Sequence, residues 1–401
     1  MSIRKLIPQL TNFFLILFIL FTVLPVKLNY SSITIVILVI LSLVNLLILK
    51  NNSFKRLKYS IFSISIPIVI YALGLINSTN IDYGLGFVSK NASFLAFPLI
   101  FFSLSKYINK DLLFKFYLLG LFVTNLYLLY LFVYYFNFGL RFYKIVTIDV
   151  YHSTYLGMYS LFAYWICFIF YNKNNSKVYL FLAIFFFLSA VVTSARIIFL
   201  LSILSAGVSL MSTTKSDGKR FAALVLIALF STTALINIPS YKQKFNQFLE
   251  LDTLSFDKNN YRSISSRFGK LEASLNVLKD NIWIGTGTGD AKDKLVEEYK
   301  KMNFTMGYKR KYNPHNQYLD NLIRNGIIGG IISLFAIYLL PFYISIRNKD
   351  KLLLAFTIIV AGVSLTESIL DTHKGITFYV FFVTLMLSSI IQDKLTFSRC
   401  K

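Results

Sequence analysis

The chain has 401 residues, of which 56% are hydrophobic and only 15% are charged. Soluble domains usually carry about 25% charged residues, so this composition indicates a bilayer protein and excludes an ordinary soluble domain. The formal net charge of +23 could suggest a nucleic-acid partner. The basic residues, however, gather in alternate short segments between apolar runs, as they do in membrane proteins. We therefore expect no nucleic-acid partner.

Apolar, nearly uncharged stretches of membrane-spanning length recur along the chain. A helix crosses lipid in about 20 residues and satisfies its own backbone groups, whereas a barrel strand needs about 10 residues of alternating polarity. The sequence therefore predicts an all-α integral membrane protein. About twelve transmembrane helices of that length are expected, at residues 12–29, 32–49, 59–76, 91–105, 116–138, 154–171, 178–194, 196–212, 221–238, 325–345, 352–370 and 376–392.

Lysine and arginine indicate how these helices are oriented. If the N-terminus is cytoplasmic, most of the basic residues in short loops fall on the cytoplasmic side, in segments 50–58, 106–115, 173–177, 215–220 and 347–351 and in the C-terminal tail. This positive-inside bias predicts that both termini are cytoplasmic. It places short outer turns near residues 27, 196 and 374 and three sizeable segments on the outer side, which are the external loop 78–90, the stretch 139–153 and a long polar loop.

The long polar loop divides the chain into three parts. Residues 1–238 would hold transmembrane helices 1–9, residues 239–324 the large outer loop, and residues 325–401 transmembrane helices 10–12 and the cytoplasmic tail. Apart from the short segments that join the apolar runs, most of the polar residues of the chain lie in this loop. We therefore expect the function of the protein to lie in or beside it.

Amphipathic helices and a glycine-rich turn are predicted within the large loop. Ser265 and Ser266 can cap a helix that has one apolar face. This face would suit the membrane interface and consists of Phe268, Leu271, Leu275 and Leu278. Gly285–Gly289 follows; its backbone amides could cradle a phosphate, but without a Walker lysine the segment is interpreted first as a turn. A polar helix is expected at 291–301.

A further helix is predicted to begin at Pro314–His315 and to run into the tenth span. Gly326, Gly329 and Gly330 would allow close helix packing there. A neutral histidine near pH 7 can accept a proton from a hydroxyl group, so His315 is a candidate general base.

Three arginines are candidates for anion binding, because a guanidinium group holds phosphate oxygens in a bidentate fork. Arg196 lies between two apolar runs, where it either snorkels to the headgroups or faces an outer cavity. Arg262 and Arg267 lie in the large loop, where they are either solvated or part of the same site. Glu367 is an ionisable group inside a predicted span, and it requires a partner.

These residues together resemble the O-antigen ligase family, which shares its fold with the Wzy-type O-antigen polymerases. One similarity is to the histidine–glycine pattern of that family. In this chain the pattern consists of His315-Asn316, nine further positions and then Gly326-x-x-Gly329. The sequences around Arg267 and Arg196 are similar to its two arginine motifs, and Glu367 stands where members often have an acid. The chain departs from the family at Leu271, where a tryptophan is common.

The resemblance implies a GT-C-like glycosyltransferase in the bacterial inner membrane, with its large loop and active site facing the periplasm. It implies an undecaprenyl-diphosphate-linked glycan as donor and a hydroxyl group of lipid A–core or of another glycan as acceptor. Membrane lipids would surround the protein, and neither a metal nor a cofactor is expected. His315 would be the general base in an inverting transfer, and Arg196 and Arg267 would hold the diphosphate. The substrate-binding residues would be Asn316, Arg262, Glu367, Gly326 and Gly329.

Two alternatives stay open at this point. A repeat-unit polymerase of the Wzy type would use the same donor, with the next repeat unit as acceptor. A flippase for lipid-linked oligosaccharides would also need many spans, but the hydropathy shows no two-fold repetition, and a single large loop lies late in the chain. The loop motif therefore favours the enzyme over the transporter.

Overall fold

The structure, a computed structural model, describes residues 3–26, 30–49, 62–135, 152–213, 242 and 263–399. Most of these residues are helical and none of them is in a strand, which confirms the all-α prediction. The chain divides into two units, treated separately below. The first comprises Met1–Val23, Leu28–Tyr117 and Ser255–Lys401, and the second comprises Leu24–Lys27 and Leu118–Leu254.

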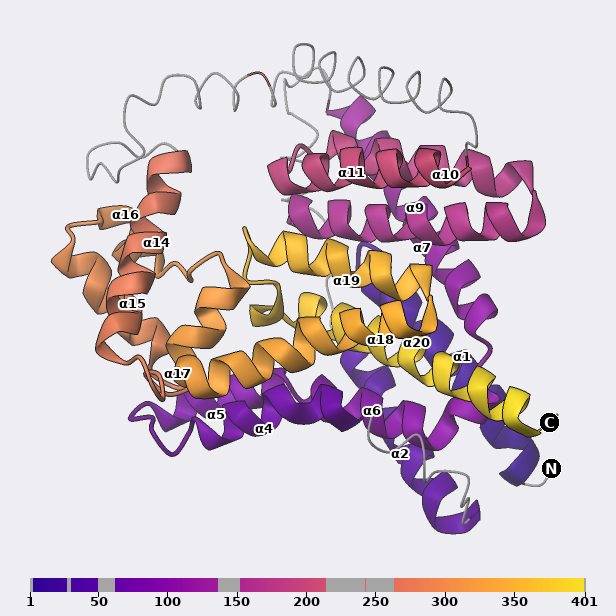
Figure 1. The fold of residues 1–401 in the computed structure, drawn as a ribbon, viewed down its shortest axis with the longest axis horizontal. Helices are drawn as coiled ribbons and strands as arrows, with labels where there is room; N and C mark the ends of the chain where they lie inside the picture. Colours follow the sequence, from indigo (N-terminus) through magenta and orange to yellow (C-terminus); the bar gives the residue numbers. More distant parts are fainter. Residues whose placement is uncertain are drawn as a thin grey trace. The chain divides into compact units, whose positions relative to one another are not determined.

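The first unit holds most of the helices (Figure 1). Its amino-terminal helices are α1 (Ile3–Val23), α2 (Tyr30–Leu49), α4 (Ile66–Leu73), α5 (Ile81–Lys90), α6 (Ser93–Leu104) and the first residues of α7 (Lys110–Tyr134). Its carboxy-terminal helices are α14 (Ser263–Asp280), α15 (Ala291–Lys301), α16 (Thr305–Arg310), α17 (Gln317–Leu334), the π-helical η4 (Phe335–Leu339), α18 (Leu340–Asn348), α19 (Lys351–Ser364) and α20 (His373–Arg399).

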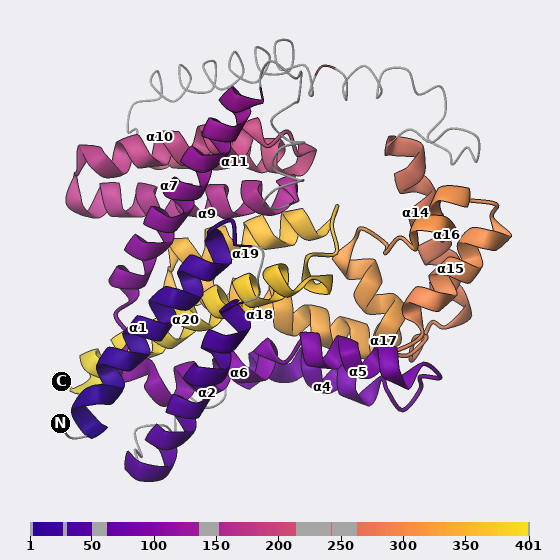
Figure 2. The same ribbon diagram turned by 180° about the vertical axis from the view of Figure 1, so that it is seen from behind.

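The second unit contains the rest of α7 and the three helices α9 (Ser153–Asn174), α10 (Lys177–Val192) and α11 (Arg196–Thr213) (Figure 2). Asn175, in the left-handed region with φ of 49°, ends α9. Ser194, with φ of 57°, lies in the turn between α10 and α11. Trp165 of α9 donates a hydrogen bond to Ser205 of α11 at 3.1 Å, which ties these two helices together.

Among the described residues, seven helical segments are long and apolar enough to cross a membrane, as in a multi-pass membrane protein. Four more apolar helices are shorter, at Ser63–Leu73, Lys177–Val192, Arg196–Ser212 and Lys351–Ser364. All predicted spans except one overlap these eleven segments, and the exception, 221–238, lies outside the described residues. A total of twelve spans stays a prediction.

The outer segment 78–90, expected to be a loop, is largely helical. Asn80 caps α5 by accepting a hydrogen bond from the Tyr83 amide at 3.2 Å, and Asp82 in the first turn favours the helix dipole. Local capping therefore decides the structure where hydropathy predicted a loop. Most of the other short outer segment, 139–153, lies outside the described residues.

α20 is the central helix of the first unit. Of its apolar window, 83% is buried, against 33% for α2, so α20 packs on all sides while α2 lies at the edge. Phe381 of α20 contacts the rings of Phe18, Phe97 and Phe101 from α1 and α6. Edge-to-face and tilted aromatic contacts of this kind add to the stabilisation from burial alone.

Several predicted outer segments meet at one end of the first unit, which we call the polar end. They are the start of α2, the end of α5, the start of α17, the end of α19 and the start of α20. Four hydrogen bonds join them, between Ser32 and His373, Lys90 and Asp371, Gln317 and Leu370, and Asn316 and Leu365. Segments that hydropathy assigned to one side of the membrane thus contact one another.

Residues 263–323 form a small helical body with a core of its own. The core consists of Ala273, Val277, Ala291, Leu295, Tyr299, Phe304 and Ile323, with five partly buried apolar residues packed against it. α14 packs on α15 and on α17. Ala273 and Ser274, both fully buried, let α14 approach its neighbours closely.

The predicted apolar face of α14 is exposed in part, and its place in the membrane interface stays a prediction. Leu271 and Leu275 are 40% and 41% exposed, whereas Lys270 and Ser274 are buried. Small and polar residues of α14 make the contacts with its neighbours, so the leucines point outward instead. The expected polar helix at 291–301 is confirmed as α15.

Candidate active site

α17 is broken at Gly326, and the break shapes the site. Gly326 has φ of 63° and ψ of −171°, a conformation essentially restricted to glycine. A Cβ at this position would lie 2.2 Å from the Trp283 carbonyl oxygen. The nine residues Gln317–Asn325 therefore form a half-helix, about 13 Å long at 1.5 Å per residue, which is set at an angle to the rest of α17 (Figure 1).

The glycine-rich turn repairs the hydrogen bonds that the break removes. In an unbroken helix the amides of Ile327 and Ile328 would donate to the carbonyls of residues 323 and 324. Here they donate to Ile282 and Trp283 at 2.8 and 3.3 Å. The freed carbonyls of Ile323 and Arg324 accept instead from Thr286 and Gly287, at 2.8 and 3.1 Å.

The interpretation of Gly285–Gly289 as a turn is confirmed. Its other three amides also donate within the protein, from Gly285 to Asn281, from Thr288 to Gly74 and from Gly289 to Ser78. All five amides are thus engaged, so the turn does not cradle a phosphate. Its function is to close the break in α17 and to fasten it to the end of α4.

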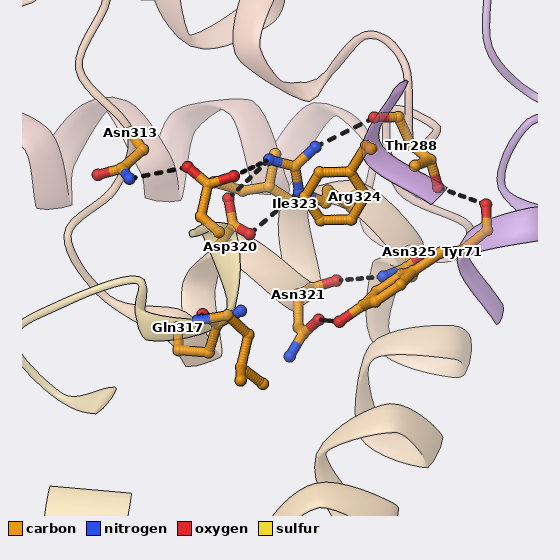
Figure 3. A network of polar contacts seen from close by, with 12 residues as sticks. Tyr71, Thr288, Asn313, Gln317, Asp320, Asn321, Ile323, Arg324 and Asn325 are labelled. Carbon is orange, nitrogen blue, oxygen red and sulfur yellow. Dashed lines mark hydrogen bonds and ion pairs between the residues drawn. The ribbon is translucent and has the colours of Figure 1, made fainter. Parts of the chain in front are cut away.

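A buried ion network holds the half-helix in place (Figure 3). Arg324 donates to both carboxylate oxygens of Asp320, at 3.0 and 3.2 Å, and to the Thr288 carbonyl at 3.1 Å. Its guanidinium group lies 3.9 Å from the centre of the Phe87 ring and 3.8 Å from Asp371. Arg324 therefore ties the half-helix to the turn, to α5 and to the segment before α20.

Asn313 connects this network to His315. Its amide group donates to the Asp371 carboxylate at 3.0 Å, and its carbonyl oxygen accepts from the His315 backbone amide at 3.1 Å. His315 has φ of 49°, in the left-handed region. This conformation is uncommon for a residue other than glycine, and Asn313 helps to hold it.

His315 forms a hydrogen-bonded pair with Glu367. The His315 Nδ1 lies 3.1 Å from the Glu367 Oε2, and the two side chains are 31% and 13% exposed. In the tautomer that donates from Nδ1 to the carboxylate, Nε2 is a free proton acceptor. The histidine and the acid that the sequence analysis singled out thus meet across 52 positions of the chain.

Asn316 begins the half-helix and also contacts α19. Its side chain caps α17 by accepting from the Leu319 amide at 3.1 Å, and it donates to the Leu365 carbonyl at 3.3 Å. The helix therefore begins two residues later than predicted from Pro314–His315, because the cap is Asn316 and His315 precedes it. This leaves the imidazole outside the helix, beside Glu367.

Lys270 is a residue of the site that the sequence analysis missed. It is only 7% exposed, and its ammonium group lies 4.2 Å from the centre of the Tyr312 ring. Tyr312 in turn contacts the His315 ring edge-on, at 6.0 Å between centres. Burial and then the charge of Arg267 lower the pKa of Lys270 to about 8, while Glu367 opposes this shift.

The three arginines predicted to bind anions differ in their position and in whether the structure describes them. Arg267 is exposed on α14, one helical turn before Lys270, and its charge acts on that lysine. Arg196 is the first residue of α11 in the second unit and is half-buried. Arg262 lies outside the described residues.

The two glycines of the pattern make close packing contacts. Gly326 lies at the break, and a Cβ at Gly329 would lie 2.9 Å from both Asn325 and Ile70. Gly329 thus lets α17 approach α4 closely, as expected from the sequence. A direct contact of either glycine with substrate stays a prediction.

These groups can perform acid–base chemistry next to a negatively charged ligand. The pair offers a proton acceptor held by a carboxylate, and Arg267 and Lys270 supply positive charge on the adjoining helix. The signal for Lys270 in the sequence was its position one turn after Arg267. A lysine in a polar loop is normally solvated, however, so its burial could not be inferred.

In the residues that the structure describes, the fold is that of a helical, multi-pass membrane protein with a cluster of polar side chains at one end of its first unit. Residues 152–334 match the family model described as O-Antigen ligase. This part of the chain is therefore similar to the O-antigen ligase family, which confirms the resemblance drawn from the motifs. It includes Arg196, Arg267, His315 and both glycines, whereas Glu367 lies beyond it.

A relative from Haemophilus influenzae (strain ATCC 51907 / DSM 11121 / KW20 / Rd), described as an uncharacterized protein, is similar over part of the chain. The two are 28% identical over 139 residues, which make up 33% of this chain and 34% of the relative. The chain therefore matches about a third of the length of that protein.

Proposed function

We propose that this protein is a membrane glycosyltransferase of the O-antigen ligase type. It moves a glycan from undecaprenyl diphosphate to a hydroxyl group of lipid A–core, at the periplasmic face of the inner membrane. The observation that carries the proposal is the His315–Glu367 pair, 3.1 Å apart and partly exposed, beside a helix that presents Arg267 and Lys270.

In the proposed reaction, His315 Nε2 takes the proton of the acceptor hydroxyl. The acceptor oxygen then forms a bond to the anomeric carbon as the bond from that carbon to the diphosphate oxygen breaks, so the configuration inverts. Glu367 fixes the tautomer and stabilises the imidazolium that forms. The proton stays on His315 until solvent or the departing diphosphate takes it.

Positive charge supports the departure of the diphosphate. Arg267 is exposed and can form a bidentate contact with phosphate oxygens, and Arg196 is proposed to act with it. Because diphosphate is already a good leaving group, charge stabilisation and positioning of the acceptor are the main tasks of the protein. Arg196→Ala and Arg267→Ala should each abolish transfer, while lysine at either position retains part of it.

A purified assay tests the proposal. Nanodisc-embedded protein is given undecaprenyl-diphosphate-linked glycan and lipid A–core, and the product is followed on a gel. Transfer by the wild type and none by His315→Ala supports the proposal. Undiminished transfer by His315→Ala refutes the role of the histidine.

Lipopolysaccharide from a deletion strain distinguishes the ligase from the polymerase. If the protein is a ligase, all surface polymer is lost and long lipid-linked chains accumulate. A single repeat unit still attached to core would show instead that the protein is a polymerase.

A further inference from the structure

Three large apolar side chains are exposed on two adjoining turns of the first unit. Ile76 is 86% exposed, Trp283 67% and Ile284 61%. Asn77 donates to the Gly285 carbonyl at 3.0 Å, so the turn after α4 and the turn after α14 lie side by side. We call Ile76, Trp283 and Ile284 the apolar tip.

The apolar tip continues an exposed apolar stripe on the helices below it. The amide of Ile328 donates to Trp283, which places the tip at the start of the apolar part of α17. From there on, α17 and its continuation expose one face, made of Ile328, Ile331, Ile332, Phe335 and Leu339. α4, which packs on α17, likewise exposes Val69 and Leu73.

Exposure of apolar side chains on α17 begins sharply at the break. Within residues 317–327, no residue is exposed, and the first exposed one is Ile328. On the other side of the tip, the last residues of α14, Lys279 and Asp280, are exposed and charged. The boundary between charged and apolar surface therefore falls within a few residues of Trp283.

We infer that the apolar tip docks on the bilayer, with Trp283 at the boundary between acyl chains and headgroups. Tryptophan is enriched at this boundary because its ring is apolar and its indole N–H remains able to donate to polar groups. An exposed apolar patch continuous with a membrane span is explained by lipid, whereas water would disfavour it. The tip then fixes the depth of the break in α17, and the inference holds whatever reaction the protein performs.

Tryptophan fluorescence tests this inference directly, because the chain has two tryptophans. Trp165 is buried in α9, so Trp165→Phe leaves Trp283 as the single probe. The variant is reconstituted in nanodiscs whose phosphatidylcholine is brominated either near the glycerol end or near the methyl end of the acyl chains. Aqueous iodide is added in a parallel titration.

Strong quenching by lipid brominated near the glycerol end, with little quenching by iodide, is the expected result. Quenching by iodide with no effect of brominated lipid overturns the inference. Protection from both quenchers also overturns it, since it would mean that protein covers the tip.

Two further variants serve as controls. In a background without tryptophan, Ile76→Trp should behave as Trp283 does. Lys309→Trp, at an exposed position of α16, should be quenched by iodide alone. If Trp165→Phe does not fold, the difference in fluorescence between the wild type and Trp283→Phe gives the same comparison.

Discussion

The two polar clusters at the polar end are built in opposite ways. Arg324 and Asp320 are 3% and 2% exposed, and the arginine has partners on three other segments. His315 and Glu367 are 31% and 13% exposed, and in the tautomer that donates from Nδ1 to Glu367 the Nε2 of the histidine can accept a proton. The closed cluster determines the shape of the site, and the open one can react with a substrate.

This contrast predicts that substitutions in the closed cluster affect folding, while those in the open cluster affect catalysis. Purified variants can be compared on both scales, by transfer activity and by the midpoint of thermal unfolding in detergent.

The largest effect is expected for Arg324→Met. It leaves Asp320 charged and buried without its partner, and breaking a buried pair in this way costs about 3–5 kcal/mol. We expect a strongly lowered unfolding midpoint or no folded protein. Arg347→Met, at an exposed position of α18, should change stability by no more than about 0.5 kcal/mol. Equal stability of the two variants would contradict the structural role of the network.

His315→Ala should lower the transfer rate by about 10²–10⁴-fold, the usual contribution of a general base. Its unfolding midpoint should stay close to that of the wild type, because the imidazole is partly exposed. His152→Ala removes a histidine that has no role in the proposed mechanism, and it should keep full activity. A large loss of stability in His315→Ala would contradict the prediction that the open cluster affects catalysis and not folding.

Gly326→Ala should destabilise the protein by about 3 kcal/mol. The backbone conformation alone costs an alanine about 1–3 kcal/mol, and the added Cβ must also displace the Trp283 carbonyl. The matched control is Gly86→Ala in α5, where the added Cβ meets no atom within 4 Å. That control should be neutral or slightly more stable.

Glu367→Gln should lower activity by about 10- to 100-fold, as is typical when the partner of a functional histidine is replaced. The glutamine amide oxygen can still accept a hydrogen bond from Nδ1, so the loss of activity measures the effect of removing the carboxylate charge. Glu297→Gln changes an exposed acid on α15 and should have no effect. Full activity of Glu367→Gln would show that His315 acts without the carboxylate.

The smallest effect is expected for Lys270→Arg, and it concerns pH. With a pKa of about 8, Lys270 loses its charge as the pH rises past that value, so wild-type activity should fall there. Arginine keeps its charge, so the decline in the variant should move to higher pH. An unchanged pH profile would mean that the charge of Lys270 is not used.

The same lowered pKa has a consequence for stability. Below pH 8 the buried ammonium opposes folding. Between about 8 and the ordinary lysine value of 10.5, the unfolded chain binds more protons, so this opposition fades as the pH rises. In Lys270→Met, the unfolding midpoint should lack the rise between about pH 8 and 10.5 that Lys270 causes in the wild type.

Hydropathy predicted the helices well, and the motif spacing brought His315 and Gly326 to attention. The helix was expected to run unbroken into the tenth span, and the break at Gly326 corrects that prediction. Capping explains where prediction failed: Asn80 begins a helix in a predicted loop, and Asn316 begins α17 two residues late. Such boundaries depend on one side chain and on few hydrogen bonds.

The buried polar residues could not be predicted in the same way. The spacing of Asp320 and Arg324 allows an ion pair on any helix, and most such pairs are solvated. Only the approach of Thr288, Phe87 and Asp371 from distant segments makes this one buried. For Lys270, too, burial results from tertiary contacts.

The repair of the break in α17 has a consequence for how the protein can evolve. The four bonds that close the break join main-chain atoms, so they do not depend on the side chains at 282, 283, 327 and 328. Those four positions can be exchanged among apolar residues, for instance to suit a different lipid, while the orientation of the half-helix is preserved. An added or deleted residue between Asn316 and Gly326 would instead turn the histidine by about 100° around the helix axis. Divergence in this segment should therefore proceed by substitution and not by insertion.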